Sequence, residues 1–254
     1  MKLMSYNIFD GAVKTLPQVI KIVNKESPDY LTLNEANTFA DSDNKILREF
    51  ANQTNFPYFD IALSGKMDYH VAVFSKYAFK KVVKLQPLER ACLIALIHTE
   101  IGELSIASLH LTPLTEDARY LEINQILSFQ EKYKNKVLMG DMNSLSRYDD
   151  YNEEIIKDFN EIRLKKYTAN GKFRFDSIDN ILSHGYFDAA LEFKKNKEYT
   201  APTLSNKDAA HSGERIDYIF LSGSLVPRLK NYFVFKNSLT DQTSDHYPIA
   251  VELK

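Results

Sequence analysis

Short polar stretches flank several apolar runs of this sequence, and each carries an amide, carboxylate or imidazole side chain. In LMGDMNSLS (138–146), Asp141 and Asn143 stand two residues apart, directly after an apolar run. An isolated Asn or Asp at such a place is usually a turn residue. Similar side chains stand at five further run ends: Asn7, Glu35, His110, Asp217, and Asp245 with His246. Loops at strand ends are where scaffolds display chemistry, so the whole set favours one shared site.

The residue types of this set suit metal-assisted phosphoester hydrolysis. Carboxylates are hard oxygen ligands for Mg²⁺ or Mn²⁺. A histidine beside an aspartate can be held in one tautomer and act as a proton carrier or a phosphate contact. The single cysteine, Cys92, excludes a thiolate zinc site, and its place in the apolar run ACLIALI predicts an inert core residue. Metal, carboxylate and imidazolium together would stabilise charge that spreads over phosphate oxygens.

The spacing of Asp141 and Asn143 in the GDMN stretch predicts that both side chains can reach one ligand. In an extended chain, Asp141 and Asn143 project to the same side of the backbone. Gly140 would let a substrate or a neighbouring backbone come close.

The elements that must position these residues are short β-rich runs and amphipathic helices. Strands are expected at 2–8, 29–35, 57–63, 70–75, 92–98, 104–110, 136–140, 216–221, 232–236 and 247–253. Helices are expected over 16–23, 42–54, 116–133 and 175–184. Several strands follow one another without a helix between them. This order predicts an α/β fold with mixed sheets covered by helices.

Composition limits the domain organisation and the partners. The chain has 254 residues, 44% of them hydrophobic, and only eight glycines and eight prolines, so no linker stands out and residues 1–254 are expected to form one domain. A net charge of -2 leaves room for a local basic groove but does not predict a strongly basic nucleic-acid binder. No stretch resembles a signal peptide or approaches the ~20 apolar residues of a membrane span. We therefore expect a cytoplasmic protein and a monomer.

The motifs SYNI, NEAN, HLTP, GDMNS, RIDYIF and SDHYPI occur in the order found in the endonuclease/exonuclease/phosphatase superfamily. The sequence resembles this superfamily from residue 3 to residue 253. The resemblance implies a four-layered α/β sandwich of the DNase I-like type, in which two mixed sheets pack face to face with helices outside. It also implies divalent-metal-dependent cleavage of a phosphoester by water, without a covalent intermediate.

The resemblance also implies a metal site. Glu35 would be the main Mg²⁺ ligand, with Asn7 beside it. Asp245 would contact the metal directly or through another ligand. Mn²⁺ is a possible substitute for Mg²⁺.

Roles for the remaining motif residues follow from the same resemblance. Asp141 would orient or deprotonate the attacking water, with Asn143 steadying the water or a phosphate oxygen. Asp217 would pair with His246, which would contact the phosphate or help to activate water. His110 would protonate the leaving oxygen or hold a phosphate oxygen. Abasic-site endonucleases resembling exonuclease III carry Tyr at the position of His110, so the resemblance is to the His-type branch. Asn34 departs from the Gln that most members have before the metal-binding Glu.

The substrate is predicted less sharply. The stretch RLKKYTANGKFRF (163–175) has five basic residues in thirteen, interleaved with aromatics, which suits a nucleic-acid backbone and stacked bases. A solvated turn before the next helix is an equal interpretation. Arg119 could instead pair with Glu116 or Glu122, and His70 could be a structural cap. The candidate substrate contacts are Arg90, Arg119, Lys172, His70 and His211.

Three functions remain open. The first is a phosphodiesterase or nuclease acting on DNA or RNA. The second is a phosphatase or phosphodiesterase for a lipid or small molecule, such as an inositol phosphate, sphingomyelin or a nucleotide. The third is a non-catalytic module that kept the fold, against which the complete motif set argues.

Overall fold

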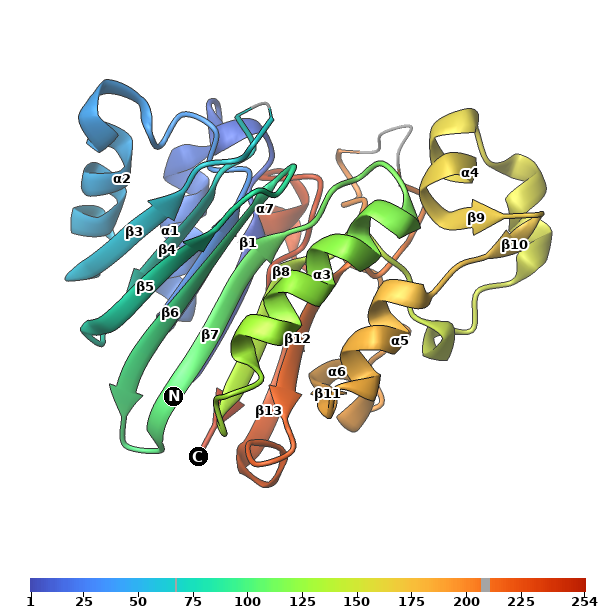
Figure 1. Cartoon of the computed structure of the whole chain (residues 1–254). Coiled ribbons are helices and arrows are strands. Elements are labelled where there is room, and N and C mark those ends of the chain that lie inside the picture. Colours follow the sequence, from blue (N-terminus) through green and yellow to red (C-terminus); the bar gives the residue numbers. More distant parts are fainter. Residues whose placement is uncertain (67, 207–210) are drawn as a thin grey trace.

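Two six-stranded sheets form the centre of the molecule in this computed structural model, which describes residues 1–66, 68–206 and 211–254 (Figure 1). The first sheet has the order β13-β14-β1-β2-β4-β3. Its strands are β13 Leu229–Val234, β14 Ile249–Leu253, β1 Lys2–Asn7, β2 Tyr30–Asn34, β4 Val71–Ser75 and β3 Tyr58–Ala62. The β1–β2 pair is parallel and its neighbours are antiparallel, so the sheet is mixed.

The second sheet has the order β11-β12-β8-β7-β6-β5. Its strands are β11 Tyr186–Asp188, β12 Asp217–Ser222, β8 Lys136–Asp141, β7 Gly102–His110, β6 Ala91–Thr99 and β5 Phe79–Leu85. Here β7 and β8 are parallel and the other pairs are antiparallel. The apolar faces of the two sheets meet in one buried cluster that includes Leu3, Val73, Leu93, Ile106, Met139 and Ile249.

Helices cover the outer faces of both sheets (Figure 1). Helices α1 Leu16–Glu26 and α2 Asp41–Gln53 pack on the first sheet through a second apolar cluster. Helices α3 Glu116–Gln130 and α5 Asp176–Ser183 pack on the second sheet through a third. The layers are therefore helix, sheet, sheet and helix, which confirms the predicted four-layered α/β sandwich. Cys92 is fully buried in the third cluster, and burial raises the pKa of its thiol well above the usual range, as expected for an inert core residue.

Shorter elements complete the chain: α4 Glu161–Tyr167, β9 Thr168–Ala169, β10 Lys172–Phe173, α6 Ala189–Glu192, α7 Ser238–Asp241, and 3-10 turns at Asp10–Ala12, Arg147–Asp149, Glu153–Asp158 and Val226–Arg228. Helix α4 and the β9–β10 hairpin stand at one end of the molecule, over a small aromatic cluster that includes Phe159, Tyr167 and Phe173 (Figure 1). Among the described residues, no helix has both the length and the apolar character needed to cross a bilayer.

Two sequence-based expectations about elements were wrong. The stretch 163–175 is not a simple turn, because it contains most of α4 and the β9–β10 hairpin. Strands β5 and β11, the two edges of the second sheet, were also missed: β5 has three exposed lysines beside its two half-buried valines, and β11 has only three residues.

Candidate active site

The polar residues predicted from the strand ends meet at one edge of the two sheets. Asn7 ends β1 and lies in register with Asn34 at the end of β2. In the second sheet, His110 at the end of β7 and Asp217 at the start of β12 both lie in register with Asp141. Parallel neighbours end at the same edge, and an antiparallel neighbour starts there, so the sheet pairing itself gathers the set.

Asp141 is the centre of this group. Its Oδ2 accepts a hydrogen bond of 3.1 Å from Asn7 Nδ2 and lies 3.4 Å from His110 Nε2 and 3.9 Å from His246 Nε2. Burial opposes ionisation, but the neighbouring His110 and His246 outweigh it and lower the pKa of Asp141 to about 2. Asp141 is therefore a carboxylate at neutral pH, held between the two sheets.

The histidines on either side of Asp141 differ in charge. Burial lowers the pKa of His110 to about 3, so its imidazole is neutral at pH 7. Burial acts in the same direction on His246, but Asp217, Asp245 and Asp141 together raise its pKa well above the usual range. The Nδ1 of His246 lies 2.8 Å from Asp217 Oδ2. This contact fixes the imidazolium with its Nε2 toward Asp141.

Oxygen donors suited to a metal lie beside Asp141. Asn7 Nδ2 lies 3.5 Å from Glu35 Oε1, and Glu35 Oε2 accepts a 2.9 Å hydrogen bond from the backbone of Asp10. Burial raises the pKa of Glu35 to about 7, and the nearby Asp245 and Asp141 add to the rise. Carboxylates that raise one another's pKa fit a hard divalent cation, because the cation offsets their mutual repulsion.

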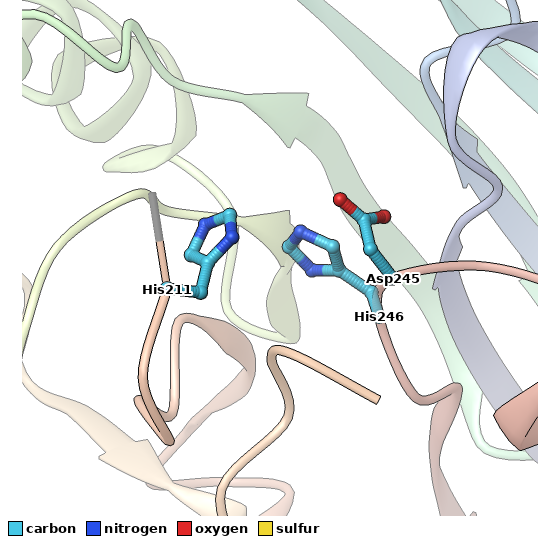
Figure 2. Close-up of side chains that lie close together, drawn as sticks. All are labelled: His211, Asp245 and His246. Carbon is cyan, nitrogen blue, oxygen red and sulfur yellow. The ribbon is translucent and has the colours of Figure 1, made fainter. Parts of the chain in front are cut away.

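Two other clusters have ligand atoms within 4.8 Å of one another: His211, Asp245 and His246, and Asp141, Asp217 and His246. In the first cluster, the ring of His211 lies against the ring of His246, and Asp245 stands on the far side of His246 (Figure 2). The two ring centroids are 5.3 Å apart at an interplanar angle of 78°.

A cavity of about 340 Å³ opens over this group. Its lining includes eight of the residues predicted from the sequence: Glu35, Arg90, His110, Asp141, Asn143, His211, Asp245 and His246. Asn7 and Asp217 lie beneath the lining and act on it through their contacts with Asp141 and His246. Acidic side chains and cationic or imidazole side chains thus share one cavity.

The sequence matches the family described as "Endonuclease/Exonuclease/phosphatase family" over residues 4–246. The chain belongs to the endonuclease/exonuclease/phosphatase family. By that description its members hydrolyse phosphoesters, which agrees with the residue types in the cavity. No curated protein sequence matches the chain.

Solved structures share the fold of this family member. An AP endonuclease from Archaeoglobus fulgidus superposes with a TM-score of 0.76 at 18% identity, covering 100% of this chain and 99% of that one. The 3′ phosphatase NExo from Neisseria, bound to a product DNA hairpin, gives a TM-score of 0.70 at 20% identity with the same coverage. A family protein from Leptotrichia buccalis gives 0.70 at 19% identity, again covering 100% and 99%. At these identities the likeness is one of fold.

Three predicted substrate contacts lie outside the cavity lining of this family member. Arg119 is fully buried and bonds to Glu116 Oε2 at 2.9 Å, so the alternative interpretation, a pair with Glu116, is confirmed. His70 accepts a 3.2 Å hydrogen bond from the backbone of Ser64, as a structural cap would. Lys172 is exposed on the β9–β10 hairpin. The assignment of these three residues as substrate contacts stays a prediction, because a basic side chain in the sequence does not reveal which way it points.

The GDMN loop reaches the site by a different path from the one expected. Asn143 has a left-handed backbone (φ 49°), so the chain is not extended there. Its backbone N–H donates to Asp141 Oδ1 at 2.9 Å, and its Nδ2 donates to the Leu111 carbonyl at 2.9 Å. Gly140 has a φ of 144°, and a Cβ there would lie 1.8 Å from the Leu109 carbonyl oxygen. The predicted close backbone approach at Gly140 is therefore confirmed.

Sequence reasoning missed six residues at the site. Phe9, Asp10, Tyr69, Pro113 and Lys166 line the cavity. Phe9 is 51% exposed and has a left-handed backbone, a combination that often marks functional sites. Asn34 is buried and bonds to the backbone of Asp141. Lys166 lay within the basic stretch 163–175, which was the available signal, but nothing separated it there from its basic neighbours.

Proposed function

We propose that the chain is a divalent-metal-dependent phosphodiesterase that cleaves DNA or RNA by direct attack of water. The observation that carries this proposal is the position of Asp141, a buried carboxylate within 4 Å of both His110 and His246 and bonded to Asn7. A carboxylate in such a place can orient a water molecule and accept its proton, and a nearby imidazolium can stabilise charge on phosphate oxygens.

The contacts of each residue indicate its role in the proposed reaction. The Asn143 backbone N–H holds Oδ1 of Asp141, which leaves Oδ2 facing Asn7 and the two histidines. His246, kept protonated by Asp217, contacts a phosphate oxygen. Neutral His110 holds another phosphate oxygen or serves the leaving oxygen.

The metal would be held by Glu35, Asp245 and the amide oxygen of Asn7, with Mg²⁺ the expected ion. A hard divalent cation there would supply Lewis-acid stabilisation of the phosphate charge. The amide of Asn7 faces two ways, since its Nδ2 donates to Asp141 while its Oδ1 accepts a 3.1 Å hydrogen bond from the Phe9 backbone. Asn7 thereby ties the metal-binding side of the cavity to the side that handles water.

Cavities that adjoin the site support a polymeric substrate. A cavity of about 270 Å³ adjoins the site and shares Phe9 and Asp10 with it, and another of about 460 Å³ shares His211. Exposed Phe9 stands between two of these cavities, where a base could stack on its ring. The fold relatives include an AP endonuclease and a phosphatase bound to a DNA hairpin, which is in keeping with this substrate class.

A panel assay tests the proposal. Single-stranded, double-stranded and abasic DNA, a 5′-tyrosyl oligonucleotide and RNA would be incubated with the protein in Mg²⁺ or Mn²⁺. Cleavage of at least one of them is expected, abolished by EDTA and reduced by roughly 10²-fold or more in Asp141→Asn. If no nucleic acid is cleaved in either metal, the proposal is wrong.

One observation favours a second candidate, a phosphodiesterase for a lipid headgroup. Phe9, Val13 and Leu204 are 51%, 68% and 63% exposed, and they line the site or its two neighbouring cavities. Exposed apolar side chains around a polar site would suit a membrane surface. Turnover of phospholipid vesicles in the same panel, without cleavage of nucleic acid, would select this candidate.

A further inference from the structure

Arg90 and Tyr69 form a stacked pair in the wall of the cavity. The guanidinium carbon of Arg90 lies 3.5 Å from the centroid of the Tyr69 ring, and both residues line the cavity. The ring of Tyr69 in turn meets the ring of His110 edge-on, at a centroid distance of 6.4 Å. Arg90 immediately precedes β6, whose first residue, Ala91, is paired with His110. The stack is therefore fixed directly to the strand pair that carries His110.

A close backbone contact joins residues 65 and 66 to the segment of Arg90. The backbone N–H of Gly65 donates to the Arg90 carbonyl at 3.2 Å, and that of Lys66 donates to the Glu89 carbonyl at 3.0 Å. A Cβ at position 65 would lie 2.1 Å from the Leu88 carbonyl oxygen, so only glycine lets the two segments approach this closely. Residues 65 and 66, shortly before Tyr69 in the sequence, are thus attached to the segment that carries Arg90.

The guanidinium of Arg90 is buried without the acceptors that other buried arginines have. Arg90 is 8% exposed, and its Nε and Nη1 have no hydrogen-bond partner among the residues that the structure describes. Three comparably buried arginines each pair with a carboxylate: Arg119 with Glu116, Arg163 with Glu214, and Arg215 with Asp149 and Asp188. Burying an unpaired charge is costly, so the exception at Arg90 indicates an anion supplied from outside the chain.

The strand order places Arg90 away from the phosphate that is cleaved. Ala91, His110 and Asp141 lie in one row across β6, β7 and β8. Two strand spacings, roughly 10 Å, therefore separate the backbone beside Arg90 from that of Asp141. An anion on Arg90 would lie beyond His110, along the cavity from the proposed water-handling carboxylate.

We propose that Arg90, braced by Tyr69, binds a second phosphate of the substrate, adjacent to the phosphate that is cleaved. This inference rests on the proposed function and names its substrate class: nucleic-acid chains or ends with at least two neighbouring phosphates, in preference to molecules with a single phosphate. A planar guanidinium is suited to this task, because it binds phosphate oxygens through two N–H groups while its face remains stacked on an aromatic ring.

Ligand binding without turnover tests the inference. Calorimetry in Ca²⁺ would compare thymidine 3′,5′-bisphosphate with thymidine 5′-monophosphate as probes. We expect the wild-type protein to prefer the bisphosphate by about 10- to 100-fold, the size of one charge-assisted contact. In Arg90→Gln the preference should fall to less than about threefold. Lys81→Gln, which removes an exposed cation on β5 outside the cavity lining, is the matched control and should keep the full preference.

Equal affinity of the wild-type protein for the two probes, or an unchanged preference in Arg90→Gln, would overturn the inference. If Arg90→Gln does not fold, Arg90→Lys decides the question: it keeps the charge but loses the planar stack, so the preference must fall several-fold. The outcomes separate this inference from the proposed function. If Arg90→Gln loses the preference for the bisphosphate while the wild-type protein cleaves no nucleic acid, the second phosphate site stands and the proposed nuclease activity is wrong. If the wild-type protein cleaves nucleic acid but Arg90→Gln keeps the full preference for the bisphosphate, the proposed function stands and the inference about Arg90 is wrong.

Discussion

The side chain of Asn34 joins the two sheets at the point where Asp141 emerges. Its Oδ1 accepts a 3.2 Å hydrogen bond from the Asp141 backbone N–H, and its Nδ2 donates to the Leu109 carbonyl at 2.8 Å. Asn34 ends β2 in the first sheet, whereas Leu109 and Asp141 belong to β7 and β8 in the second. Asn34 also precedes Glu35 directly, so one residue sets the spacing between the candidate metal ligand and the candidate base.

Asn34→Ala should therefore reduce both stability and turnover. It leaves a buried N–H and a buried carbonyl without partners, at a cost of about 1–3 kcal/mol each. Because Asp141 is no longer tied to the first sheet, kcat should fall by more than about tenfold while KM changes little. Urea unfolding and steady-state kinetics check the two effects. Asn24→Ala, which removes one exposed amide bonded to the Gln53 carbonyl, serves as the control. An unchanged kcat in Asn34→Ala would show that Asn34 has no positioning role.

The parts of the site that could be predicted from sequence are those encoded along single strands. Asn7, His110 and Asp141 each end an apolar run, and sheet pairing brings such ends together. The contacts of Asn34 could not be predicted, because they cross between sheets to residues 75 and 107 positions away. The local backbone of Asn143 was also wrongly expected to be extended, since its left-handed φ depends on the contacts of its side chain and N–H in the folded loop.

The positions of the residues that face the cavity were even harder to predict from the sequence. Lys166 reaches the cavity because α4 is attached to the rest of the molecule by a hydrogen bond from Arg119 to the Lys166 carbonyl. Arg90 faces the cavity because Gly65 permits a close backbone contact. Arg90 was a candidate only because it is basic, and neither arrangement leaves a pattern in the sequence that separates these residues from other basic or small ones.

Asp217→Asn should lower kcat by roughly 10²- to 10⁴-fold on any substrate that the wild-type protein cleaves. The amide has almost the shape of the carboxylate, but it lacks the negative charge that favours the protonated form of His246. The positive charge near the phosphate is then less favoured, whereas the packing is retained. Steady-state kinetics measure the loss, and circular dichroism verifies the fold. Activity within threefold of wild type would exclude the proposed role of the Asp217–His246 pair.

His110→Asn should make the protein less sensitive to acid. Burial lowers the pKa of His110 from 6.5 to about 3, so the unfolded chain binds more protons than the folded one between these values. The contribution of the neutral imidazole to stability is thus complete above pH 6.5 and declines as the pH falls, by up to about 1.4 kcal/mol per pH unit.

Urea unfolding at about pH 7, 6 and 5 measures this decline. The free energy of unfolding should fall less steeply in His110→Asn than in the wild-type protein, by about 1 kcal/mol or more over that range. His98→Asn changes an exposed histidine and should follow the wild-type slope. Parallel slopes for wild type and His110→Asn would mean that His110 accepts a proton in the folded protein as readily as in water.

The buried ion pair of Glu116 and Arg119 should contribute strongly to folding stability, because it connects several segments around the site. Arg119 bonds to the Thr112 carbonyl at 3.1 Å and to the Lys166 carbonyl, while Glu116 accepts hydrogen bonds from the Ser144 hydroxyl and the Ser177 backbone. Removing one partner of such a pair leaves a buried charge, so Arg119→Met should cost about 3–5 kcal/mol of stability.

A double-mutant cycle separates the loss of the pair from the loss of packing. In Glu116→Gln with Arg119→Met, no charge is left buried, so the double variant should be more stable than the sum of the two single losses predicts, by about 1 kcal/mol or more. Urea unfolding of the four proteins gives the coupling energy. Strict additivity would mean that Arg119 is held by its carbonyl contacts alone, and that Glu116 acts independently on the loop that follows Asp141.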